Sequence, residues 1–103
     1  MSSETFTDLT LGPIDDSESY QRSGQFWEKA FRLSGPVPPG WAALFDEVWE
    51  GARYEPKRHA RIENGFLMTI CLVSELQGEH GDFLVAAVAR TNAAFRAQLT
   101  ASR

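Results

Sequence analysis

The sequence offers little from which a cross-link, a membrane anchor or a secretion signal could be built. Cys71 is the single cysteine, so no disulfide can form within the chain. No stretch approaches the roughly 20 apolar residues that span a bilayer, and the N-terminus lacks the basic start and apolar run of a secretory signal. These absences predict a protein of the reducing cytoplasm. The composition, rich in Ala, Arg and Gly with two lysines, is typical of a bacterium.

Motifs that carry known chemistry are also missing. The chain contains no CxxC, HxxxH or HExxH spacing, no glycine-rich nucleotide loop and no GxSxG motif. Cys71 lies in an apolar run, where a thiol has a raised pKa and packs as a hydrophobe. His59 and His80 are then the remaining candidates for proton transfer. We expect no metal and no cofactor, and we favour a protein without catalysis of its own while leaving the question open.

The length and the charge pattern predict one domain with an acidic leader. A chain of 103 residues has room for a single core, and 43% hydrophobic residues suffice to build one. Residues 1–20 carry a charge of −5 and the rest of the chain +1. We therefore predict a flexible acidic segment over 1–22 and a globular domain over 23–103, with the strand-forming residues 5–11 as a candidate added strand.

Periodicity predicts three helices and one hairpin. Apolar spacing indicates helices from Gly24 to Leu33 and from Trp41 to about Tyr54, and a long final helix from Asp82 to Ala101. Asn64-Gly65 between two extended runs is the strongest short signal for a two-residue turn. The predicted fold is α+β in the order α-α-β-β-α, with helices packed on a small antiparallel sheet that residues 5–11 or a second chain could extend.

The turn also fixes which residues share a face of the hairpin. Strands over 57–63 and 66–74 place four apolar residues of the second strand on one face, beside charged residues of the first. Helices can cover one face of such a sheet, which leaves the other face for another chain. The candidate interface is Phe66, Met68, Ile70 and Leu72. Closed two-fold dimers are the commonest assemblies, so we favour a homodimer over a monomer, although helices wrapping both faces would leave nothing exposed.

The first strand carries a basic cluster with two interpretations. It could contact an anion or an acidic partner, or it could be a solvated strand edge whose charges prevent aggregation. The near-neutral domain and the lack of interleaved exposed aromatics argue against nucleic acid. The cluster's candidate contact residues are Arg53, Lys57, Arg58 and Arg61.

Two hypotheses on function follow. The first is a small cytoplasmic bacterial protein that binds and regulates through a protein–protein surface, with a protein partner or a second copy of itself, and without membrane contact. The alternative is a small enzyme or ligand-binding domain with a pocket between sheet and helices that uses His80 or His59.

Overall fold

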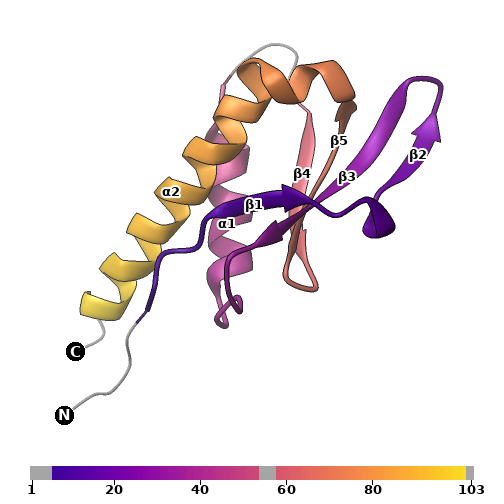
Figure 1. Ribbon diagram of the computed structural model, residues 1–103. Coiled ribbons are helices and arrows are strands. Elements are labelled where there is room, and N and C mark those ends of the chain that lie inside the picture. The colour runs from indigo at the N-terminus through magenta and orange to yellow at the C-terminus, as the bar shows by residue number, and fades with distance from the viewer. Residues whose placement is uncertain (1–5, 54–57, 102–103) are drawn as a thin grey trace.

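The computed structural model describes residues 6–53 and 58–101, which form a sheet of five strands and two helices (Figure 1). Two short 3-10 turns, η1 and η2, join some of these elements. In chain order they are β1 (Leu11–Ile14), η1 (Asp16–Glu18), β2 (Tyr20–Ser23), β3 (Phe26–Leu33), α1 (Trp41–Gly51), β4 (His59–Glu63), β5 (Phe66–Leu72), η2 (Val73–Gln77) and α2 (Glu79–Ala101).

Strand β3 is the centre of the sheet. β5 pairs with it from Phe26 to Arg32, and β4 pairs with the outer edge of β5. The other edge of β3 is shared, because β1 pairs with its C-terminal half and β2 with its N-terminal half. All these pairings are antiparallel. The turn η1 separates β1 from β2 and lets one stretch of chain follow β3 in two pieces.

The predicted element order α-α-β-β-α is wrong. The segment predicted as a helix from Gly24 to Leu33 is the central strand β3, and two further strands precede it. Ser23 is a residue type that often caps the start of a helix. Gly24, however, has a φ of +58° and lies in the turn that joins β2 to β3. The strand that extends the sheet near the N-terminus is Leu11–Ile14 and not residues 5–11. The α+β class and the long C-terminal helix are confirmed.

The reason for the error is visible in the residues of β3. This strand packs on both faces, so its aromatic and apolar residues do not alternate with polar ones as they would in a half-buried strand. Phe26, Ala30 and Leu33 have helical spacing, but Phe26 and Ala30 lie on one face of the strand and Leu33 on the other. A continuous run of this kind fits either element, and the pairing with β5 favours the strand.

The hairpin prediction is confirmed. Asn64 and Gly65 have φ values of 53° and 83°, as the predicted two-residue turn requires. The expected pairs of Glu63 with Phe66, Arg61 with Met68, and His59 with Ile70 are all present. Lys57, expected opposite Leu72, lies outside the described residues.

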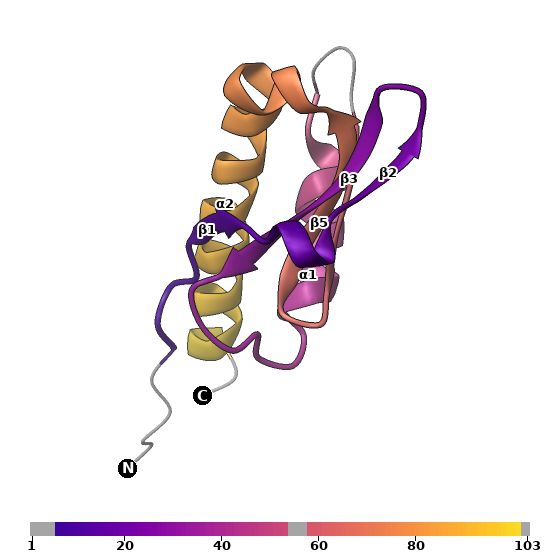
Figure 2. The ribbon, with the colours of Figure 1, turned by 45° about the vertical axis from the view of Figure 1, so that its right-hand side comes forward.

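Both helices pack on the same face of the sheet. Helix α1 contributes a stripe of three aromatic side chains, whose ring centroids are each 6.1 Å from the next. Trp41 and Phe45 are fully buried and Trp49 nearly so, against Leu33, Ala60 and Leu67 of the strands and against α2. Figures 1 and 2 show α1 and α2 side by side along the sheet. Of the described helices, none has a stretch long and apolar enough to cross a lipid bilayer.

Asn92 ties the N-terminal segment to this core. Its side chain is buried in α2, where Oδ1 accepts hydrogen bonds from the backbone N–H of Leu9 at 3.2 Å and from Nε1 of Trp41 at 3.1 Å. Its Nδ2 donates to the Leu9 carbonyl at 2.9 Å. Asn92 is a polar residue within the largely apolar buried side of α2. It is therefore the point where α2, the start of α1 and the segment around Leu9 meet. The division of the chain into a flexible segment 1–22 and a domain 23–103 stays a prediction, although β1 and β2 belong to the sheet.

Candidate interaction face and its polar network

The face of the sheet that points away from the helices is the candidate functional site. We call it the open face. The four predicted interface residues alternate along β5 on this face, because Leu67, which lies between two of them on the same strand, packs in the core against the helices. Met68 is 8% exposed, and Phe66, Ile70 and Leu72 are half-buried. Antiparallel sheets often leave one face to water, but that face then carries polar side chains. Here it carries an apolar row.

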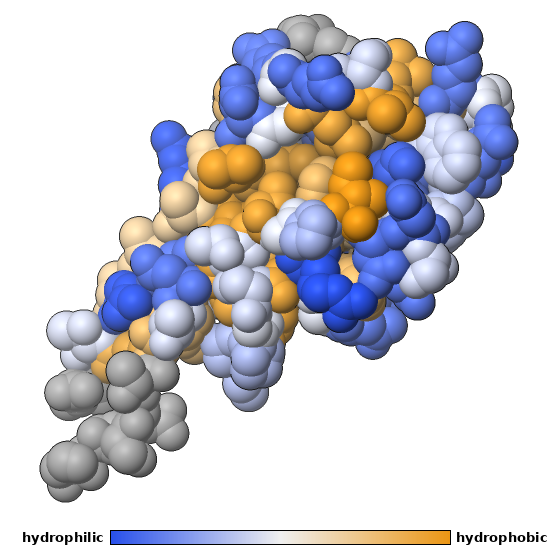
Figure 3. Space-filling model, viewed as in Figure 1, coloured by the Kyte–Doolittle hydropathy of each residue, from blue (hydrophilic) through white to orange (hydrophobic). Residues whose placement is uncertain are grey.

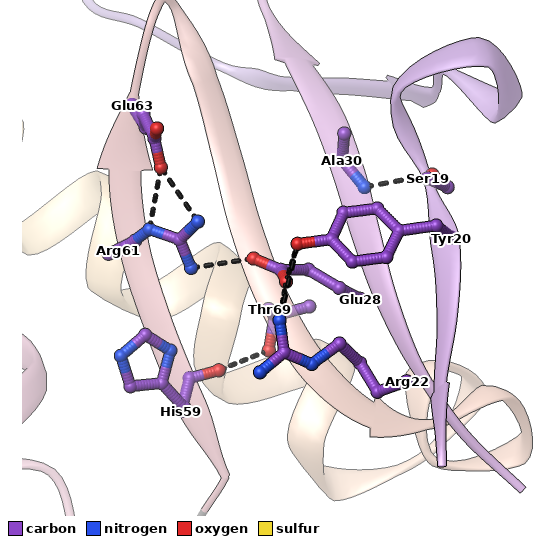
Figure 4. A network of polar contacts seen from close by, with 9 residues as sticks. All are labelled: Ser19, Tyr20, Arg22, Glu28, Ala30, His59, Arg61, Glu63 and Thr69. Atoms are coloured by element: carbon purple, nitrogen blue, oxygen red, sulfur yellow. Dashed lines mark hydrogen bonds and ion pairs between the residues drawn. The ribbon is translucent and has the colours of Figure 1, made fainter.

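Glu28 lies in the middle of the open face and is fully buried (Figure 4). The hydroxyl of Tyr20 donates to its Oε1 at 2.5 Å, and Nη1 of Arg22 lies 3.1 Å from the same oxygen. Nη1 of Arg61 lies 2.6 Å from Oε2, close enough for an ion pair, yet that oxygen receives no well-directed hydrogen bond. A buried carboxylate thus lies between two guanidinium groups and a phenol.

The network links four neighbouring strands. Tyr20 and Arg22 belong to β2, Glu28 to β3 and Arg61 to β4, and β5 lies between the last two. Strands are spaced about 4.8 Å apart, so the backbones of β4 and β3 are separated by about 10 Å, a distance that the side chains of Arg61 and Glu28 bridge together across β5. The side chain of Arg61 therefore crosses the apolar row beside Met68, its register partner. Arg61 also pairs with Glu63, which is 2.7 Å from Nη2.

Electrostatics keep the Glu28 carboxyl ionised. Burial alone would raise its pKa, but the hydrogen bond from Tyr20 and the charges of Arg61 and Arg22 outweigh that effect and lower the pKa. The same carboxylates hold Arg61 charged and raise its pKa against the effect of burial. The Glu28 carboxylate and the guanidinium groups of Arg22 and Arg61 therefore stabilise one another's charged forms on a face where neither kind of group is fully hydrated.

Arginines also shield two aromatic rings at the ends of the row, Phe66 of the row itself and Phe26 of β3, which pairs with Leu72. The guanidinium of Arg32 lies 5.2 Å from the ring centroid of Phe66, and that of Arg58 lies 5.0 Å from the centroid of Phe26. Such cation–π contacts cover the rings without burying them under a second layer. The row is consequently bordered by charge at each end and crossed by Arg61 in the middle.

The structure does not bring the predicted basic cluster together into one site. Arg58 forms a two-pronged pair with Glu75, with contacts of 2.8–3.2 Å. Arg61 forms ion pairs with Glu28 and Glu63, and Arg53 donates hydrogen bonds to carbonyl groups at the end of α1. Lys57 lies outside the described residues. β4 is an edge strand, as the interpretation of the cluster as a charged edge requires.

His80, a candidate for proton transfer, is buried between α2 and the sheet. Its Nε2 lies 2.8 Å from Oγ1 of Thr69, and that hydroxyl donates its one proton to the His59 carbonyl at 2.6 Å. The hydrogen shared between His80 and Thr69 must then be on Nε2 of the imidazole. Burial lowers the pKa of His80 and favours the neutral ring. The His59 ring lies on the open face (Figure 4), so the two rings do not meet.

Two cavities formed by described residues stand out, and no histidine is among the residues that line them. A groove of about 810 Å³ lies between residues 6–9, the proline turn 34–39 and the C-terminal end of α2. A smaller notch of about 310 Å³ lies between the end of α1 and the middle of α2. Cys71 is fully buried, which raises the pKa of its thiol to about 11. In the described parts of the chain, no three of His, Cys, Asp and Glu gather as a metal site would require.

Sequence reasoning missed Tyr20, Arg22 and Glu28. Tyr20 and Arg22 lie in the segment 1–22 that is predicted to be flexible, and Glu28 lies in the segment predicted as a helix from Gly24 to Leu33. The aromatic residues around Glu28 are compatible with a strand, but the run fits a helix equally well, and only the pairing of β3 with β5 places Glu28 on the same face as the row. The chain matches no protein-family model, and it has no match among curated proteins or solved structures.

We predict that Glu28→Gln lowers the free energy of unfolding by about 1–3 kcal/mol at pH 7, since a buried charge-assisted network loses its anion. Glu63→Gln is the matched control, because it pairs with the same Arg61 from an exposed position and should cost at most about 0.5 kcal/mol. Urea unfolding measures both.

The pH dependence of that difference has a defined sign. Glu28 has a lowered pKa when folded, so its contribution is complete above the unfolded value near 4.5 and is lost as the pH falls through the folded value. The difference in the free energy of unfolding between the wild type and Glu28→Gln should therefore become smaller below pH 4.5. Equal costs for the two variants at pH 7 would contradict the central role of Glu28.

We predict that His80 titrates below 6.5 in the folded protein, because burial lowers its pKa and favours the neutral ring. NMR of the imidazole Cε1–H signals measures this, and His59→Gln assigns the two resonances. The unfolded chain binds the proton more readily, so the stability from His80 is complete above pH 6.5 and declines below it. A titration at or above 6.5 would show that the ring is not buried as described.

Proposed function

We propose that this chain is a small binding protein of the bacterial cytoplasm that acts through the open face of its sheet and has no chemistry of its own. The observation that carries the proposal is the row of Phe66, Met68, Ile70 and Leu72 on a face that neither helix covers. In a two-layer fold the outer face should be polar, so four consecutive outward positions with apolar residues indicate a contact surface.

The charge on the open face favours a second copy of this chain as the occupant. The chain as a whole carries −4, which repels identical copies. The charged residues around the row balance, because three arginines pair with three carboxylates. They are Arg22, Arg32 and Arg61 with Asp15, Glu28 and Glu63. A neutral face with an apolar centre can meet its own copy without leaving charge unpaired, which a strongly charged partner could not do.

A two-fold arrangement also suits the geometry of the face. Isologous contacts place the same surface of both copies together, so a row in the middle of the face would meet itself near the axis. The surrounding ion pairs would then form a polar rim. The proposed homodimer is a sandwich of two sheets with the helices of both copies on the outside.

Other exposed apolar side chains provide a control surface. Among the described residues, four large apolar or aromatic side chains have more than a third of their surface exposed: Tyr20, which belongs to the open face, and Ile14, Val73 and Val85. Figure 3 shows apolar surface in the angle between α2 and the strands, away from the open face. Val85, 58% exposed on α2, therefore allows the competing surface to be tested by the same kind of substitution.

We predict that the wild type sediments as a dimer and that Ile70→Glu weakens the dimer about 30-fold or more, as a central contact worth about 2 kcal/mol would. Ile70 is half-buried in the isolated chain, so the fold should persist, which circular dichroism checks. Val85→Glu adds the same charge on α2 and should leave the dimer intact.

A mixing experiment sharpens the test. Ile70→Glu and Ile70→Lys chains should each be monomeric, whereas an equimolar mixture should recover dimer, because the opposite charges meet near the axis. A wild type that remains monomeric at high concentration would overturn the homodimer. If Val85→Glu dissociated the dimer and Ile70→Glu did not, the dimer contact would lie on the surface around Val85 of α2 and not on the open face.

A further inference from the structure

The notch between the two helices has features of a ligand site that the proposed function does not use. It lies where the C-terminal end of α1 meets the middle of α2, and its volume of about 310 Å³ is at the lower end of the range for small-molecule sites. Its walls are apolar or small, except for two arginines. The lining residues are Val48, Gly51, Ala52, Arg53, Phe83, Ala86, Ala87 and Arg90.

Arg90 differs from the other arginines in the structure. Arg22, Arg32, Arg58, Arg61 and Arg96 each form an ion pair with a carboxylate. Arg90 is exposed at the notch and makes no hydrogen bond or ion pair within residues 6–53 and 58–101. Its guanidinium therefore keeps all its donors available to a ligand.

Arg53 supplies the second positive charge. Its Nη1 lies 3.0 Å from the Glu50 carbonyl and 3.4 Å from that of Ala52, so it offsets the negative end of the α1 dipole. Without it, the free carbonyl groups of the helix end would disfavour an anion beside the notch. Among the described residues 6–53 and 58–101, none that lines the notch is acidic.

We propose that this notch binds a small organic anion, a carboxylate attached to an apolar ring or chain. The planar guanidinium of Arg90 matches a carboxylate, which it can bind through two parallel N–H donors. Val48, Phe83 and Ala87 provide the apolar contact for the body of the ligand. The inference stands apart from the homodimer, because the helices lie on the far side of the sheet from the open face and the notch stays accessible in the dimer.

Titration with 2-naphthoate, followed by amide NMR, tests the site on the full chain. We expect shifts concentrated at the end of α1 and over residues 83–90. Arg90→Gln should weaken binding about tenfold, as the loss of a charge-assisted contact does. Ala86→Leu fills the notch from an exposed helix position and should abolish binding while Arg90 is retained.

Two controls separate a built site from general attraction. Arg96→Gln removes the same charge from the same helix outside the notch and should leave the affinity unchanged. Naphthalene-2-methanol, the neutral analogue, should bind at least tenfold more weakly, because the guanidinium loses its anion. Absence of binding at millimolar naphthoate, equal binding of the neutral analogue, or equal binding by Ala86→Leu would overturn the proposal, whatever the oligomeric state.

Discussion

The packing of both helices on one face of the sheet is the constraint on which the rest of this structure depends. The aromatic stripe of α1 and the apolar side of α2 form a single core against β4, β5 and the C-terminal part of β3. The part of the chain that the structure describes contains no third helix that could cover the opposite face. That face must then be stabilised by its own side chains or by another molecule. Both are visible in its residues. A buried ionic network stabilises the face from within, and an apolar row offers a contact to another molecule.

The Glu28 network is the internal solution. A carboxylate on the central strand draws arginines from both sides, and one of them crosses β5 to reach it. These contacts hold β2 against β3, and they place the methylene groups of the Arg61 side chain over the row. Buried ion pairs stabilise a fold weakly, because desolvation offsets much of the attraction, but removal of one partner is costly. The network therefore fixes the positions of the strands more than it contributes net stability.

The sequence was sufficient for the local part of this picture and insufficient for the rest. Asn64-Gly65 determined the turn, the pairing and the membership of each face, because a two-residue turn leaves no freedom of register. It therefore indicated an apolar row beside charge. The nature of β3 was not accessible in the same way, since a strand packed on both faces has no alternation to detect. With β3 assigned as a helix, Glu28, Tyr20 and Arg22 could not be brought together, and the partners of Arg61 stayed hidden.

The N-terminal half shows the same limit. Leu9 and Asn92 are 83 residues apart, and their hydrogen bonds follow from the tertiary fold alone. Arg61 and the cation–π contact of Arg32 cover the row on β5 in part, and we propose that a second copy covers what stays accessible of Phe66, Ile70 and Leu72. Isotope-filtered NOE measurements on a mixture of labelled and unlabelled chains test this most directly. We expect intermolecular NOEs from the methyl groups of Met68 and Ile70. Their absence in a sample shown to be dimeric, or NOEs confined to Val85, would contradict it.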